Sequence, residues 1–461
     1  MVQRPNIILL LADQLRACSV GYAGEEPVVT PHLDRLAKEA VNFRNAVSPL
    51  PVCTSYRGSL ITGRTPLSTG LVLNDIALST REQTLAVLLK QAGYDTAYIG
   101  KWHLNGKNRK AWVPPGPLRQ GFDYWAAANF EHNYDHSIYF EGDSPEPMTW
   151  EGFDAEAQTQ KALHYLGTRD DEKPFCLILS WGPPHHPYRI VPQRYLAMYD
   201  GQPSYVRLNC PSPPYDDLKG YYAQTTFIDE MVGRMLTGIA QSGMAEDTIV
   251  VFTSDHGDMH GSHDVFKKQW PWDESIKVPF LLRYPRKVAQ GRVFDAPISV
   301  IDIMPTLLGL ADVTVPDRVE GVNLAPHILG AAADMPKSVL LMNPCPFSVG
   351  DPRSPDQYPT FRGKRMEYRG VRTATHTYVR TIDGPWLLYD NIADPYQLRN
   401  LIEEPDHAQC AAELDAAMRA HMERIDDRFL PKEAYYERYG IAVDHRGKVN
   451  GIIDNVYDRL G

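Results

Sequence analysis

The stretch 51-PVCTSYRGSLITGR-64 places Cys53 behind a proline and ahead of an apolar segment, together with arginines and a Thr-Gly pair. A buried structural cysteine needs none of these neighbours. A short loop that enters a helix explains them, because the first N–H groups of a helix are free to bind an anion and the helix dipole lowers the pKa of a nearby thiol. The stretch therefore predicts that Cys53 lies at an anion-binding catalytic centre.

The whole chain has the composition of a soluble globular protein. Its 461 residues are too many for one ordinary core, so we expect a large domain with a smaller one. The formal net charge is -10, whereas a general nucleic-acid binder carries a basic face that neutralises phosphates. Basic residues near Cys53 would then bind an anion at that site, and we expect no nucleic-acid partner.

The cysteines and the N-terminal segment indicate a compartment. The six cysteines are scattered, without a CxxC pair or the spacing of a zinc site, which favours reduced thiols. The apolar run at residues 7–12 is too short for a signal peptide, and no segment reaches the ~20 apolar residues that a membrane helix needs. We therefore expect a cytoplasmic enzyme without a membrane partner.

Several apolar segments are predicted to be buried strands, and each runs into polar side chains. These segments and the residues after them are 6–12 with Asp13 and Gln14, 95–100 with Lys101 and His103, 174–181 with His185, and 248–253 with Asp255 and His256. In open α/β sheets, ligands bind at the carboxyl ends of the strands. Taken alone, each residue is explained at least as well by an ordinary role, such as a helix N-cap at Asp13. Together they predict one site.

The remaining patterns predict an α/β architecture. A further strand is expected at 278–282, and helices are expected at 30–40, 84–92, 221–240 and 301–310. We predict a large mixed, mostly parallel sheet flanked by helices.

The chain changes character after about residue 345, where Pro-rich loops give way to short alternating runs typical of a small antiparallel sheet. We therefore expect a catalytic domain over 1–345 and a smaller C-terminal α+β subdomain with a tail over 346–461. Residues 105–150, rich in Pro, Gly and aromatic side chains, are expected to form a long loop that either binds a ligand or is a solvated surface segment. That loop contains a cluster from His132 to His136.

The residues at the strand ends suit a metal-assisted displacement. The candidate ligands for one divalent cation are Asp13, Gln14, Asp255 and His256, and the groups expected around it are Cys53, Arg57, Lys101, His103, His185 and Lys268. Oxygen donors favour a hard cation, with Ca²⁺ as our first expectation and Mn²⁺ or Mg²⁺ as alternatives. A metal and lysines neutralise the non-bridging oxygens of a tetrahedral anion while a histidine protonates the leaving oxygen, so we expect displacement at sulfur or phosphorus.

These residues stand in motifs that resemble a known family. The motifs, in chain order, are CTSYRGSLITGR, GKWHL, PHHP, TSDHG and LLYDNIADPYQLRNL. Each is weak alone, but in this order and spacing the chain resembles the type I sulfatases of the alkaline phosphatase superfamily. The resemblance implies the alkaline phosphatase-like sulfatase fold and hydrolysis of a sulfate monoester.

The resemblance also implies roles for individual residues. Cys53 would be oxidised by a formylglycine-generating maturation enzyme, and the hydrate of the resulting aldehyde would be the nucleophile and a metal ligand, stabilised by the metal and Arg57. Lys101 and His103 would hold the hydrate and the sulfate oxygens. His185 and Lys268 would lie near the leaving group, with His185 as the general acid. Lys101, His185 and Lys268 would thus be the substrate-binding residues.

The chain departs from the family pattern at a few positions. Ser55 stands where the maturation motif has Pro, and Tyr56 stands where it commonly has Ser. Gln14 replaces a common Asp, and His256 replaces a common Asn. The Gln14 replacement lowers the anionic charge around the metal, and both replacements also occur in relatives that cleave phosphonate or phosphate esters.

Three hypotheses follow. The first is a sulfatase that acts on a small-molecule aryl sulfate or a saccharide sulfate, either as a monomer or as a homo-oligomer. The second is a phosphonate monoester hydrolase or phosphodiesterase that uses the same site. The third is a metal-containing anion-binding protein in which Cys53 stays unmodified because Ser55 disrupts the maturation motif.

Overall fold

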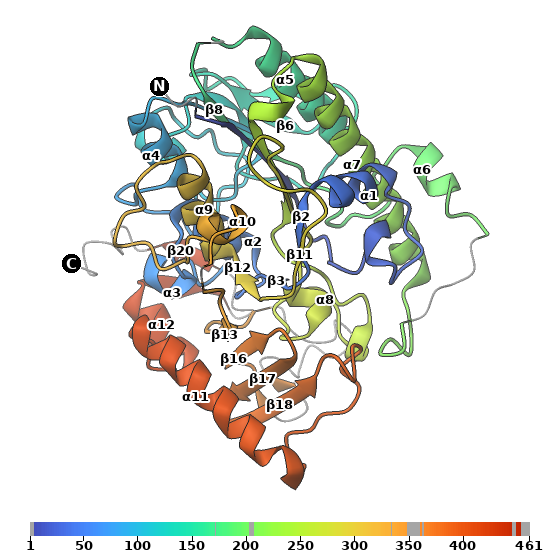
Figure 1. Ribbon diagram of the computed structural model, residues 1–461, viewed down its shortest axis with the longest axis vertical. Coiled ribbons are helices and arrows are strands. Elements are labelled where there is room, and N and C mark those ends of the chain that lie inside the picture. The colour runs from blue at the N-terminus through green and yellow to red at the C-terminus, as the bar shows by residue number, and fades with distance from the viewer. Residues whose placement is uncertain are drawn as a thin grey trace.

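A ten-stranded mixed sheet forms the centre of the protein, seen here in a computed structural model (Figure 1). The residues that the structure describes are 4–170, 172–201, 207–332, 334–347, 360–361, 364–444 and 449–452. The strand order is β11-β2-β10-β9-β1-β8-β4-β5-β6-β7. The strands are β1 (Asn6–Ala12), β2 (Val41–Phe43), β4 (Asp95–Lys101), β5 (Tyr124–Ala128), β6 (Ile138–Glu141), β7 (Met148–Thr149), β8 (Phe175–Ser180), β9 (Thr248–Ser254), β10 (Phe280–Arg283) and β11 (Val293–Phe294).

Strand β1 is buried on both faces. It pairs in parallel with β8 on one side and with β9 on the other. Its alternate residues Ile7, Leu9 and Leu11 belong to one hydrophobic core, and Ile8 and Leu10 belong to a second. Two cores explain why this strand is a continuous apolar run rather than an alternating one.

Helices cover both faces of the sheet (Figure 1). One core is closed by α1 (Pro31–Glu39), α5 (Asp154–Thr168) and α7 (Tyr215–Gln241). The other is closed by α2 (Cys53–Thr62), α4 (Leu85–Gln91), α9 (Ile303–Leu310) and α10 (Ala325–Ile328). The shorter elements include α3 (Pro66–Thr69), α6 (Gln193–Ala197), α8 (Asp273–Ile276), β3 (Ala46–Val47) and β12 (Ile298–Ser299).

A smaller antiparallel sheet follows, with the order β13-β16-β17-β18, and α11 lies across it at the bottom of Figure 1. Its elements are β13 (Ser338–Asn343), β16 (Tyr368–Thr373), β17 (His376–Thr381), β18 (Gly384–Asp390) and α11 (Ala408–Arg424). Short hairpins β14 (Thr360–Phe361)–β15 (Lys364–Arg365) and β19 (Ile441–Val443)–β20 (Val449–Ile452), and helix α12 (Lys432–Arg438), complete this part. The first strand of the small sheet precedes residue 345, and the division of the chain at that position stays a prediction.

The predicted fold class is confirmed: a mixed sheet flanked by helices and a small C-terminal antiparallel sheet. The helix expected at 221–240 begins earlier, at Tyr215, and the one expected at 301–310 begins with a 3₁₀ turn, Val300–Asp302. The expectation of a long loop over 105–150 is wrong, because this segment contains β5, β6 and β7. These strands are short and end at turns, so their alternation was too brief to stand out. In the described part of the chain, no helix combines the length and apolarity that crossing a bilayer requires.

Candidate active site

Helix α2 presents Cys53 as its first residue, at the carboxyl edge of the sheet. The strands that carry the predicted polar groups, β9, β1, β8 and β4, are neighbours in the sheet, so their ends converge there. Cys53 is 2% exposed. Ser55, which stands where the maturation motif has Pro, donates a hydrogen bond from its hydroxyl to the carbonyl of Leu71 at 2.5 Å. Ser55 therefore has a structural partner within the first turn of α2.

A quartet of buried donors surrounds the start of α2. Asp13, Cys53, Asp255 and His256 each offer one ligand atom, and these atoms all lie within 4.8 Å of one another. Nδ1 of His256 lies 2.9 Å from the carbonyl oxygen of Gly257, which accepts only from a protonated nitrogen. The lone pair therefore sits on Nε2, which lies 3.2 Å from the sulfur of Cys53. An imidazole fixed in this way is the usual state of a metal ligand.

Arg57 holds the two carboxylates in place. Its Nη2 donates to Asp13 at 3.0 Å and to Asp255 at 3.2 Å, while Nη1 donates to the hydroxyl of Ser180 at 2.7 Å. Burial alone would raise the pKa of Asp13, but the charges of Lys101 and Arg57 hold that pKa well below its ordinary value. Asp13 is therefore a carboxylate inside the protein.

Gln14 lies beside the quartet, but its amide nitrogen points elsewhere. Nε2 donates to Asp258 at 2.8 Å and to the hydroxyl of Tyr188 at 2.9 Å. A metal contact from Gln14 would therefore come from its amide oxygen. Sequence reasoning did not use Asp258, although it stands in the same strand end as Asp255, because nothing in its spacing indicated a contact with Gln14.

The lysines bring positive charge to Cys53. The ammonium of Lys268 lies 3.0 Å from the sulfur of Cys53, 2.9 Å from Nε2 of His256 and 3.4 Å from Nε2 of His185. Lys101 makes an ion pair with Asp13. Burial and Asp13 raise the pKa of Cys53, but Lys101 and Lys268 outweigh them and hold it well below the ordinary thiol value.

The adjacent lysines Lys267 and Lys268 have different surroundings. Lys268 is half-buried against the quartet, whereas Lys267 is exposed and contacts Asp258 only through its backbone N–H. Lys268, and not Lys267, therefore brings its ammonium to the site.

His185 contacts the site through Lys268. Its Nδ1 lies 2.8 Å from the carbonyl of His186, so Nδ1 carries the proton and Nε2 faces the ammonium of Lys268. Burial, and then the charge of Lys268, hold the pKa of His185 well below its ordinary value. In the unliganded protein His185 is therefore a neutral imidazole that presents Nε2 to the site.

The side chain of His103 has its hydrogen-bond partner outside the donor quartet. Its Nε2 lies 3.1 Å from a carboxylate oxygen of Asp75, and its ring lies tilted against that of Phe130 with centroids 3.9 Å apart. Nδ1 is buried and has no hydrogen-bond partner among the described residues. Sequence reasoning missed Asp75, because it lies in a loop without periodicity and meets His103 only through the packing of that loop.

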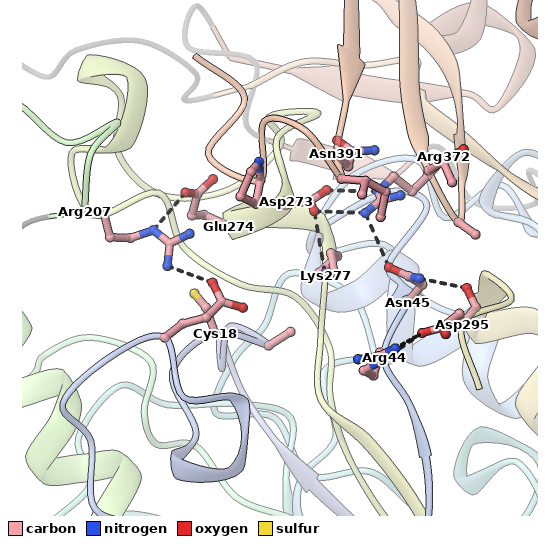
Figure 2. Close-up of a pocket in the computed structure, with 16 residues that line it drawn as sticks. Cys18, Arg44, Asn45, Arg207, Asp273, Glu274, Lys277, Asp295, Arg372 and Asn391 are labelled. Carbon is pink, nitrogen blue, oxygen red and sulfur yellow. Dashed lines mark hydrogen bonds and ion pairs between the residues drawn. The ribbon is translucent and has the colours of Figure 1, made fainter. Parts of the chain in front are cut away.

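A second charged region lies between α8 and the C-terminal sheet. It is a cavity of about 420 Å³, and Figure 2 shows Arg207 beside Glu274 and Arg372 beside Asp273. Both arginine contacts are 3.1 Å long. None of the predicted site residues lines this cavity. Its cations already face carboxylates, so it offers no free charge to a sulfate.

The chain matches the family model described as Sulfatase over residues 5–313. This chain belongs to the sulfatase family. It is also 42% identical over 445 residues to an ulvan-active sulfatase of Formosa agariphila, across 95% of this chain and 84% of that protein. The protein is therefore a sulfuric ester hydrolase, as the sequence motifs predicted.

Further relatives of this sulfatase agree with that assignment. An endo-4-O-sulfatase of Bacteroides thetaiotaomicron is 29% identical over 497 residues, across 95% of each chain. A solved structure from work on the metabolism of multiple glycosaminoglycans by Bacteroides thetaiotaomicron gives a TM-score of 0.82 at 29% identity, covering 95% of this chain and 98% of that chain. The alkaline phosphatase-like fold is thereby confirmed.

The family implies a metal ion and a formylglycine, and the residues of this sulfatase fit both. Two carboxylates and an imidazole lone pair converge with residue 53, which would add an oxygen once oxidised. Such a donor set suits a divalent cation. The unpartnered Nδ1 of His103 and Nε of Arg57 are buried polar atoms that a bound anion can satisfy.

Proposed function

We propose that this sulfatase hydrolyses a sulfate monoester of a carbohydrate, with formylglycine at position 53 and Ca²⁺ as its metal. The observation that carries the proposal is the placement of Cys53 at the start of α2, between His256 and Lys268 and inside a quartet of metal-ligand atoms. Relatives that act on ulvan or have endo-4-O-sulfatase activity support a saccharide substrate.

Asp13, Asp255 and His256, with the amide oxygen of Gln14, would hold the metal beside residue 53. The hydrated aldehyde supplies the nucleophile, and the metal supplies positive charge for it and for the sulfate oxygens. Oxygen donors outnumber the single imidazole, which favours Ca²⁺ over softer cations.

The protein's own side chains would bind the sulfate and manage one proton. Lys101 and Lys268 would neutralise the negative charge of the sulfate oxygens, and Arg57 would offset the charge of the Asp13 and Asp255 carboxylates through its ion pairs with them. His185 presents the lone pair of Nε2 on the side of Lys268. The negative charge of the bound sulfate would favour uptake of a proton from water at Nε2, and the resulting imidazolium would give that proton to the oxygen of the departing sugar.

A substrate panel tests the proposal. We expect purified enzyme to release sulfate from sulfated saccharides, and to prefer an aryl sulfate to the matched aryl phosphonate in kcat/KM. A clear preference for the phosphonate would instead support a phosphonate monoester hydrolase. Binding of these anions without hydrolysis of any of them would support an anion-binding protein with unmodified Cys53.

The metal is tested separately. Dialysis against a chelator followed by addition of Ca²⁺, Mn²⁺ or Mg²⁺ should restore turnover best with Ca²⁺. Restoration by Mn²⁺ but not by Ca²⁺ would contradict the proposed metal and would assign Mn²⁺ to the site instead.

A further inference from the structure

The segment between β5 and β6 places the hydroxyl of Tyr134 among three histidines. This oxygen lies 3.1 Å from the carbonyl oxygen of His186, 3.4 Å from Nδ1 of His185 and 3.4 Å from Nδ1 of His132. Tyr134 is 3% exposed. A neutral phenol carries one proton, and the carbonyl of His186 is the partner that can only accept. The Tyr134 hydroxyl therefore donates to that carbonyl.

The same carbonyl determines the state of His185. It accepts the proton on Nδ1 of His185 at 2.8 Å, which leaves the lone pair on Nε2 facing Lys268. Tyr134 and His185 thus donate to the same acceptor, the carbonyl of His186. The tyrosine fixes the position of this carbonyl, and the carbonyl orients the imidazole of His185.

Packing holds the tyrosine in this position. A Cβ on Gly182 would lie 2.5 Å from Cε1 of Tyr134, so only glycine allows the ring to lie against this loop. The imidazole of His185 is restrained as well, because the ring of His132 stacks on it with centroids 4.4 Å apart and planes within 10°. The His185 ring is therefore restrained by a stacked ring as well as by hydrogen bonds.

We propose that Tyr134 is a positioning residue for His185. By holding the His186 carbonyl, Tyr134 keeps Nε2 of His185 directed at the oxygen of the departing alcohol. The inference rests on the proposed function only in that His185 is taken as the proton donor. It gives a role to one residue of the His132 to His136 cluster, and it explains why Gly182 precedes the PHHP motif.

A tyrosine that merely fills space would affect all substrates alike. A tyrosine that orients a proton donor should matter most for poor leaving groups, because a sugar alkoxide needs a proton in the transition state and a nitrophenolate hardly does. The dependence on the leaving group therefore separates the two roles.

The test compares Tyr134→Phe with wild type on a sulfated saccharide and on 4-nitrophenyl sulfate. We expect kcat on the saccharide to fall by about a hundredfold and kcat on the aryl ester to fall by less than about threefold. Tyr165→Phe is the matched control, because the hydroxyl of Tyr165 is buried without a hydrogen-bond partner among the described residues. Equal losses on both substrates, or no loss on either, would overturn the proposal.

A second variant and a second readout make the test independent of turnover. Gly182→Ala should displace the Tyr134 ring and reproduce the same selective loss. In ¹⁵N NMR of labelled histidines, assigned with His185→Gln, the His185 ring should be protonated on Nδ1 in wild type and become a mixture of tautomers in Tyr134→Phe. An unchanged His185 signal would contradict the inference, whereas failure of wild type to hydrolyse any saccharide sulfate would contradict the proposed function instead.

Discussion

The active site and the cavity of Figure 2 both gather charged side chains, but they balance these charges differently. In the cavity, Arg44, Arg207 and Arg372 each contact a carboxylate. At the active site Arg57 and Lys101 contact carboxylates, whereas Lys268 has no carboxylate within ion-pair distance among the described residues and lies against Cys53.

This difference separates a structural network from a site for chemistry. A cation paired with a carboxylate at close range stabilises the fold but has little charge left for a ligand. A surplus cation beside a nucleophile and unpartnered polar atoms is typical of a site that binds an anion. The number of charged residues is therefore a poorer guide to function than whether each one is already neutralised.

The largest expected contrast is between two cysteines. Cys53→Ala should lower kcat by at least about ten-thousandfold, because it removes the precursor of the nucleophile. Cys18→Ala, in the wall of the cavity, should leave kcat within about twofold of wild type. Initial rates on a sulfated saccharide measure both variants, and comparable losses would show that Cys53 is not the reacting residue.

Removal of the metal should have the next largest effect. A chelator should reduce turnover by about a thousandfold, because several kcal/mol of charge stabilisation is lost. The charge pairs of the cavity need no metal, so the melting temperature should change far less than the rate. Full activity in enzyme shown by elemental analysis to be free of metal would contradict the assignment of the donor quartet.

Two lysines, one at the active site and one in the cavity wall, extend the comparison of the two regions. Lys268→Ala should lower kcat/KM by about a hundredfold, since it removes an unneutralised charge at the sulfate. Lys277→Ala removes a lysine that lies 3.6 Å from Asp273 in the cavity wall, and it should change kcat/KM by less than about twofold. Similar losses in the two variants would remove the basis for separating the two regions.

Asp75 tests the support of His103. Asp75→Asn weakens the contact with Nε2 of His103 and should lower kcat by about tenfold through misplacement of the imidazole. Asp143→Asn, at a carboxylate on the protein surface, serves as the control for loss of one charge. If both variants behave like wild type, His103 does not need this partner.

The cavity itself should affect stability rather than rate. Arg372→Met leaves Asp273 without its main partner, so the free energy of unfolding should fall by about 3 kcal/mol with kcat unchanged. Adding Asp273→Leu should restore much of the loss, because the unpaired charge is then removed as well. Urea denaturation measures both; a change of kcat without a loss of stability would assign the cavity a functional role.

Sequence patterns predicted the parts of the molecule that depend on local chemistry. The strand at 6–12 and its polar end, Asp13, could be predicted because a strand covered on both faces must be apolar and its ligands must follow it. The position of Cys53 at a helix start could also be predicted, because the proline before it and the apolar segment after it indicate a short loop that enters a helix.

The remaining features depend on contacts between distant segments. Asp75 reaches His103 across 28 residues, Asp258 reaches Gln14 across 244, and Tyr134 reaches His185 across 51. None of these pairs produces a periodic pattern or a motif, because long-range packing brings them together. Strands β5–β7 were missed because segments so short carry too little alternation to distinguish them from a loop.

The most direct test of the central claim is mass spectrometry of the peptide that contains residue 53. Trypsin should release this peptide by cleavage after Arg44 and Arg57. The fraction of the peptide that carries the aldehyde should rise in proportion to specific activity across preparations. Fully active enzyme in which residue 53 is only a free thiol would contradict the account.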